Sequence, residues 1–183
     1  MNSSILSVLR CLAGLVVLFS ASGVMGQSPV KSSLPGDPMT ADCNYWRSLV
    51  DRSVEKPVTD QRIDESNSDT IIFGIRCLLT LQGNKNPARF SGVTRTDVSQ
   101  TFDEATADVA ALYYISYLYT GRFDHARAVA LRDPQNGQFN SDRAIGLAFQ
   151  AYKKWFGKVE RIGLRRAREI ALDPLKGAKT GWY

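Results

Sequence analysis

Five basic side chains near the C-terminus have the most distinctive spacing of any chemically capable groups in the sequence. They are Lys154, Lys158, Arg161, Arg165 and Arg168. Steps of four, three, four and three place all five on one face of a continuous helix. A cationic face of this kind attracts phosphate, anionic lipid or acidic glycan, although most charged helix faces are simply solvated. We therefore predict a candidate anion-binding surface, on condition that Gly163 does not break the helix.

The charge balance of the chain is uneven along its length. Residues 153–183 carry nine basic and three acidic side chains, whereas residues 27–152 carry 13 basic and 15 acidic ones. The formal charge of the whole chain, +5, is too small to indicate specific nucleic-acid binding. We therefore expect a phosphate-bearing or carboxylate-bearing partner to bind the C-terminal region.

The sequence lacks the common catalytic, cofactor and metal motifs. Its one histidine, His125, excludes any site that needs two histidine ligands from one chain. No glycine-rich phosphate loop and no nucleophile elbow occurs. Carboxylate pairs such as Asp103 and Glu104 suit glycoside hydrolysis only where the fold fixes their separation, and helix capping explains them more simply. We predict no cofactor, metal or catalytic residue, and we favour a protein that is not an enzyme.

The first 26 residues have the pattern of a cleaved secretory signal peptide. An apolar run, CLAGLVVLF, spans residues 11–19, and small residues follow it up to a cleavage point after Gly26. The alternative is an uncleaved membrane anchor, which is interrupted by Ser7 and Arg10. We expect a secreted or periplasmic protein, with membrane association only if this segment is retained. Residues 27–39, which are rich in proline and serine, predict a flexible leader before a single domain at 40–183.

Two cysteines remain after such a cleavage, Cys43 and Cys77. In an oxidising compartment an even pair predicts a disulfide, worth roughly 3–4 kcal/mol across this separation. The alternative is two buried free thiols.

The hydrophobic periodicity predicts an all-α domain of five or six helices. We expect helices from Thr40 to about residue 50, at 69–82, from Thr101 or Asp103 to 120, within 121–134, at 142–162 and at 164–172. The stretch at 109–119, VAALYYISYLY, is apolar all round and predicts the buried centre of a bundle. Its tyrosines belong either to the core or to the wall of a pocket.

Residues 84–100 form the longest polar, turn-rich stretch inside the predicted domain. Loops of this length are often functional, so Pro87, Arg89, Phe90 and Arg95 are candidate binding residues. The alternative is a surface connection anchored by Phe90.

The combined pattern favours an exported, non-catalytic module that binds a protein or an anionic envelope component such as a lipid or glycan. A periplasmic inhibitor or immunity-type protein is one alternative. A cell-wall-directed hydrolase with unidentified carboxylates is another. The sequence identifies no specific partner.

Overall fold

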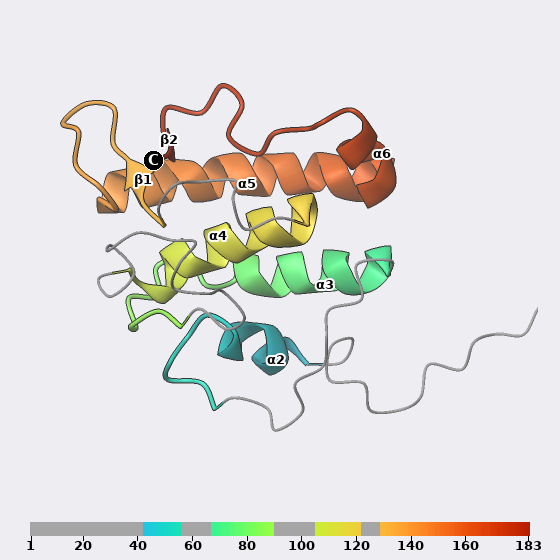
Figure 1. Cartoon of the computed structure of the whole chain (residues 1–183), viewed down its shortest axis with the longest axis horizontal. Helices are drawn as coiled ribbons and strands as arrows, with labels where there is room; N and C mark the ends of the chain where they lie inside the picture. The colour runs from blue at the N-terminus through green and yellow to red at the C-terminus, as the bar shows by residue number, and fades with distance from the viewer. Residues whose placement is uncertain (1–41, 56–66, 90–104, 122–128) are drawn as a thin grey trace, which may run out of the picture. The chain divides into compact units, whose positions relative to one another are not determined.

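The computed structural model describes residues 42–55, 67–89, 105–121 and 129–183. Within these ranges the chain forms five helices and one two-stranded sheet (Figure 1). In chain order the elements are α2 (Cys43–Ser48), α3 (Ser68–Leu79), α4 (Ala107–Thr120), β1 (Leu131–Arg132), α5 (Asp142–Ile162), α6 (Leu164–Glu169) and β2 (Gly181–Trp182). More than half of the described residues are helical, which confirms the expectation of a mainly helical fold.

The predicted signal peptide and leader, residues 1–39, lie outside the described residues, as do Asp103, Glu104 and His125. Within the described ranges no helix has both the length and the hydropathy needed to cross a bilayer.

Helix α4 lies at the centre of the helical packing because its sequence is apolar on every side. Twelve of its 14 residues are buried, and it packs against α3 on one side and α5 on the other (Figure 1). Gly121 ends the helix with a φ of 71°, and its N–H donates to the Tyr117 carbonyl at 2.7 Å. This left-handed conformation favours glycine, which has no Cβ to clash with the backbone.

Helix α5 confirms the predicted helix at 142–162. The side chain of Ser141 accepts a hydrogen bond from the Ala144 N–H at 3.1 Å and so caps its N-terminus. One face of α5 is buried against the core, and the opposite face carries its charged side chains. The buried residues are Ala144, Ile145, Ala148, Phe149, Tyr152, Trp155, Phe156 and Val159.

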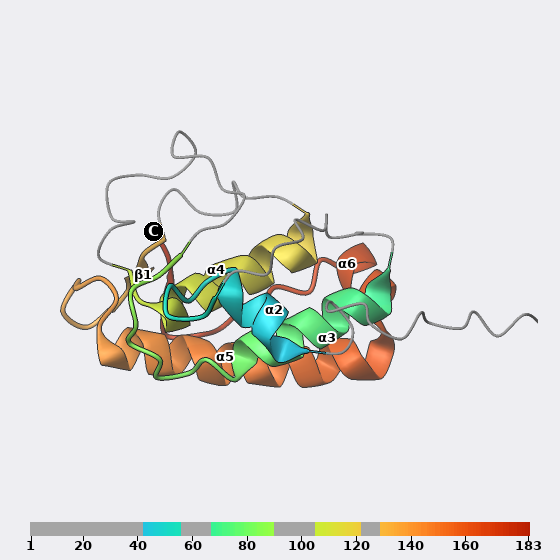
Figure 2. The same cartoon turned by 90° about the horizontal axis from the view of Figure 1, so that it is seen from below.

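The predicted disulfide is present and joins α2 to α3. The Cys43 and Cys77 sulfur atoms are 1.97 Å apart, with a Cα–Cα distance of 5.2 Å. Figure 2 shows α2 lying against α3. The indole ring of Trp46, fully buried, packs directly over Gly74, where a Cβ would lie 2.7 Å from the ring. The bridge and this close contact hold a six-residue helix that is too short to be stable alone.

The predicted helix boundaries need five corrections. The first helix begins at Cys43 and is capped by Asp42, whose side chain accepts from the Asn44 N–H at 2.8 Å, so Thr40 is not its cap. The second helix spans Ser68–Leu79 and so ends three residues before the expected boundary at 82, because the chain turns from Thr80 onwards. The third helix begins at Ala107, because residues 105 and 106 are extended and pair with residues 87 and 88. Residues 131 and 132 are strand because they pair with residues 181 and 182, so the helix expected within 121–134 does not extend there. The last helix ends at Glu169, since Ala171 has a φ of 47°.

Candidate ligand-binding site

The C-terminal strap, residues 170–183, runs from the end of α6 back along α5 to strand β1 (Figure 1). Its far end is fixed by antiparallel pairing of Leu131 with Trp182, and the Tyr183 N–H donates to the Ala130 carbonyl at 2.9 Å. Its near end is fixed by Trp155, whose indole N–H donates to the Leu172 carbonyl at 2.9 Å. The strap is thereby attached to the helices at both ends.

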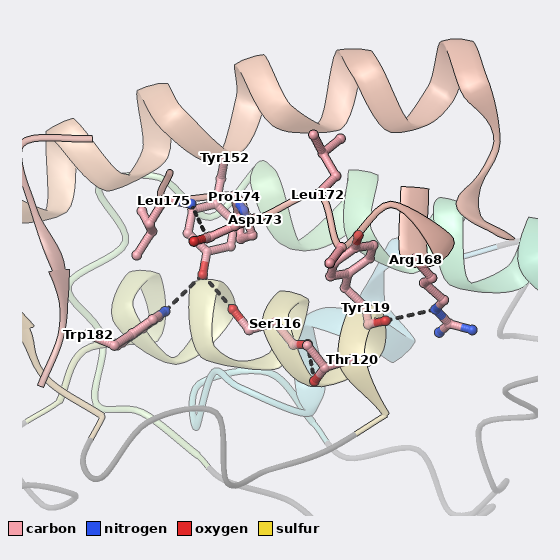
Figure 3. Close-up of a pocket in the computed structure, with 11 residues that line it drawn as sticks. Ser116, Tyr119, Thr120, Tyr152, Arg168, Leu172, Asp173, Pro174, Leu175 and Trp182 are labelled. Atoms are coloured by element: carbon pink, nitrogen blue, oxygen red, sulfur yellow. Dashed lines mark hydrogen bonds between the residues drawn. The ribbon is translucent and has the colours of Figure 1, made fainter. Parts of the chain in front are cut away.

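A cavity of about 500 Å³ lies between the strap and helices α4, α5 and α6 (Figure 3). Ser116, Tyr119 and Thr120 come from α4, Tyr152 from α5 and Arg168 from α6, and strap residues 171–175 and 182 complete the wall. The lining is mainly apolar. Volume and lining are both typical of small-molecule sites, which span roughly 300–1,000 Å³.

A chain of hydrogen bonds crosses the wall of the cavity from the strap to α4. The Trp182 indole N–H donates to the Tyr152 hydroxyl at 2.9 Å, and that hydroxyl is 2.5 Å from the Ser116 hydroxyl. The Ser116 hydroxyl in turn donates to the Leu112 carbonyl at 3.2 Å. Each polar group in this chain is satisfied, which removes the free-energy penalty of burying it.

Burial raises the pKa of Tyr152 well above its usual range, and this effect exceeds the opposing hydrogen bonds from Ser116 and Trp182. Its hydroxyl therefore stays protonated at neutral pH. A tyrosine in this state is a hydrogen-bonding wall group and not a general base.

Arg168 is committed to the end of α4. Its Nε donates to the Tyr119 carbonyl at 2.8 Å, and its Nη2 donates to the Leu118 carbonyl at 2.8 Å. These are two of the C-terminal carbonyls that no helical N–H can reach, and a guanidinium there also suits the helix dipole. Figure 3 shows Arg168 and Trp182 at opposite ends of the cavity.

A second, smaller hollow of about 170 Å³, the lysine groove, lies between α5 and the strap. Its cationic side chains are Lys154 and Lys158 from α5 and Lys176 from the strap. Its one carboxylate is Asp173, and no carboxylate of the described residues lies within ion-pair distance of the three ammonium groups. Residues 172–174 line both hollows.

The structure divides the five basic residues of the predicted cationic face into three groups. Gly163, with a φ of 83°, ends α5, so Arg165 and Arg168 belong to a separate helix. Lys154, Lys158 and Arg161 remain on the exposed face of α5. Arg165 lies 3.8 Å from Glu169. Arg168 is turned towards α4 as described.

Two of the four candidate loop residues are described, and both have structural partners. Pro87 pairs with Thr106 in an isolated bridge. The Arg89 guanidinium donates to the carbonyls of Ser48 and Val54 at 3.0 and 3.2 Å, which ties this part of the loop to the segment after α2. Phe90 and Arg95 lie outside the described residues.

Sequence reasoning missed Trp182, Ser116 and the strap itself. The strap has no helical or strand periodicity, and its role depends on pairing with residues some fifty positions earlier. The aromatic pair Trp182–Tyr183 at the end of this aperiodic tail is the one signal that indicates an anchored segment.

The two hollows contain few groups capable of acid–base or nucleophilic chemistry. Between them they contain one carboxylate, Asp173, and no nucleophile paired with a base. In the described ranges no cluster of three or more His, Cys, Asp or Glu side chains has the geometry to hold a metal ion. Comparisons of the chain with protein-family models, with curated proteins and with solved structures gave no match.

Proposed function

We propose that this chain is an exported, non-catalytic binding protein whose lysine groove binds a phosphate- or carboxylate-bearing component of the cell envelope. The observation that supports this most directly is the convergence of Lys154, Lys158 and Lys176 on one hollow. Among the described residues that line the groove, Asp173 is the one carboxylate that opposes their charge. Residues 153–183 carry a net formal charge of +6, which also attracts anions to this part of the molecule.

The strap distinguishes the lysine groove from a charged face on a single helix. Lys154 and Lys158 are one helical turn apart on α5, and Lys176 comes from a different segment held beside them. Charges brought together from separate elements create a local potential that a single exposed helix lacks. We expect an anionic group that enters the groove to be attracted by all three ammonium groups.

Binding is tested with Lys154→Gln plus Lys158→Gln. Each lysine near an anionic membrane contributes about 1 kcal/mol, so the double variant should bind vesicles containing anionic lipid about 30-fold more weakly. The same variant is assayed on an acidic glycan, which identifies whether lipid or glycan is the source of the anion. Binding should also weaken as salt is raised, because added ions screen these exposed charges.

The matched control is Lys153→Gln plus Arg165→Gln, which removes the same charge outside the groove. Lys153 donates to the Gln82 side chain at 2.7 Å, and Arg165 is beside Glu169. This control should keep most of the affinity. If both double variants lose the same affinity, binding depends on total charge and not on the groove. If neither variant loses affinity, the proposal is rejected.

The export part of the proposal is supported by the Cys43–Cys77 bridge, because such bridges persist mainly in oxidising compartments. Mass spectrometry of purified protein should give a chain that begins at Gln27, with no thiol that reacts before reduction. An intact N-terminus on protein recovered from the cytosol would contradict export.

A protein partner, as in an inhibitor or immunity-type protein, is a second candidate because one exposed aromatic pair is available. Phe139 and Tyr183 are 46% and 58% exposed, and their rings lie 4.9 Å apart. Exposed aromatic side chains are frequent energetic centres of protein interfaces. Under this alternative, Phe139→Ser plus Tyr183→Ser releases a defined co-purified partner and leaves vesicle binding intact.

The hydrolase alternative receives no support from these hollows. Glycoside hydrolysis requires two carboxyl groups about 5–10 Å apart. The cavity and the lysine groove share the single carboxylate of Asp173.

A further inference from the structure

The cavity under the strap has polar groups that are already occupied by one another. The hydroxyls of Ser116 and Tyr152 are bonded together, and the Thr120 hydroxyl donates to the Ser116 carbonyl at 2.8 Å. A ligand body that needed hydrogen bonds here would have to displace these contacts. Apart from the charged side chains of Arg168 and Asp173, the remaining wall consists of aromatic rings and aliphatic strap residues. The body of a ligand that fits is therefore apolar.

Arg168 supplies the charge at one end of this cavity. Two of the five guanidinium N–H groups bind the carbonyls of α4, and no described residue accepts from Nη1. No carboxylate of the described residues forms an ion pair with this side chain. The two carbonyl bonds fix the orientation of the guanidinium, so little side-chain entropy is lost when a carboxylate binds it.

Asp173 is the one wall residue that opposes an anion. Its carboxylate is exposed, and one oxygen accepts from the Leu175 N–H at 2.8 Å. Lys154, Lys158 and Lys176 share the lysine groove with it on the other side of the strap. An organic cation in the cavity would thus meet one carboxylate and four basic groups nearby. The overall charge favours an anion.

We infer that this cavity binds a small amphipathic carboxylate, with its apolar body between Tyr119, Tyr152 and Trp182 and its carboxylate at the Arg168 end. The site is separate from the lysine groove and does not depend on the proposed envelope function. Its ligand class is a short-chain or medium-chain aliphatic or aromatic monocarboxylate.

Three probes of equal chain length and different charge test the ligand class by titration calorimetry. They are decanoate, decanol and decyltrimethylammonium, each used below its aggregation concentration with the full chain. Decanoate should bind at least tenfold more tightly than decanol, and the cation should bind most weakly. Removing one methylene from the carboxylate should weaken binding about fourfold, which corresponds to about 0.8 kcal/mol.

Two variants test whether decanoate binds in this cavity. Thr120→Trp places a large ring at the cavity wall from an exposed position at the end of α4 and should weaken decanoate binding at least tenfold. Arg168→Met should remove the preference for decanoate over decanol while decanol affinity is kept. The control Lys153→Gln, which lies outside the cavity, should leave decanoate affinity within twofold. Circular dichroism monitors folding, and if Arg168→Met does not fold, Thr120→Trp and the probe series still decide.

If the cationic probe binds most tightly of the three, the inference that the ligand is an anion is wrong. Failure of all three probes to bind, or decanoate binding that is unchanged in Thr120→Trp, would overturn the site. Vesicle binding is scored separately from decanoate binding. Loss of decanoate binding in Thr120→Trp with vesicle binding retained would support this site, and vesicle binding that is unchanged in the lysine variants would reject the proposed function alone.

Discussion

Breaking the Cys43–Cys77 bridge should cost the protein a large part of its stability. The two cysteines are 34 residues apart, and closing a loop of that size lowers the entropy of the unfolded chain by about 13 cal/mol/K, or about 4 kcal/mol at 25 °C. Domains are stable by about 5–15 kcal/mol in total, so this is a substantial fraction. For a chain of this length the melting temperature should fall by about 8–15 °C.

Urea unfolding followed by circular dichroism measures the effect on three samples. Oxidised protein and reduced protein differ only in the bond, because both retain the two sulfur atoms. Cys43→Ala plus Cys77→Ala also removes the sulfur atoms, and since Cys77 is only 1% exposed, that variant should be less stable than the reduced protein. The difference between these two samples gives the contribution of sulfur packing.

A difference of less than about 1 kcal/mol between oxidised and reduced protein would refute this reasoning. It would mean that contacts in the unfolded chain already hold residues 43 and 77 close together, so that the bond removes little entropy. An unchanged urea midpoint with a changed slope would indicate instead that the compactness of the unfolded state had altered.

Three further predictions follow from other parts of the fold. Gly74→Ala should destabilise the protein by about 1–3 kcal/mol, because the added Cβ would overlap the Trp46 ring. Gly157→Ala, on the open face of α5, should instead stabilise it by about 0.5–1 kcal/mol. Urea unfolding of both variants measures these opposite effects. Burial raises the pKa of Asp51, but hydrogen bonds from Ser53, Asn86 and Asn84 outweigh this and hold the pKa below its ordinary value. Its stabilisation is therefore present above pH ~4 and is lost as the pH falls towards the folded pKa, so Asp51→Asn should flatten the acid limb of the stability curve. Tyr152 has the opposite behaviour: its raised pKa means that stability falls above pH ~10, where the unfolded tyrosine ionises and the folded one does not. Tyr152→Phe should reduce the alkaline slope by up to about 1.4 kcal/mol per pH unit, and an unchanged slope would place the alkaline sensitivity elsewhere.

The helices with regular hydrophobic periods were predictable from the sequence. The apolar stripe of α5 is a local signal, and both boundaries of that helix agree with the structure. The all-apolar segment of α4 was correctly assigned to the core, and the cysteine pair followed from composition.

The candidate sites were less predictable because they depend on long-range pairing. Spacing alone placed Arg168 on a surface face, but the turn at Gly163 redirects α6 and brings the guanidinium to the carbonyls of α4. Thr106 was expected inside a helix, but its bridge to Pro87 holds it in an extended conformation. The strap is not periodic, so nothing local indicates that Trp182 reaches Tyr152.

Residues 172–174 form a partition with the apolar cavity on one side and the lysine groove on the other. A molecule that shifts this partition while occupying one side changes the dimensions of the other side. The two affinities are then thermodynamically linked, and the linkage is reciprocal: whatever factor the first ligand imposes on the second, the second imposes on the first. Movement of the strap alone would be enough to make one small protein respond to two unlike molecules.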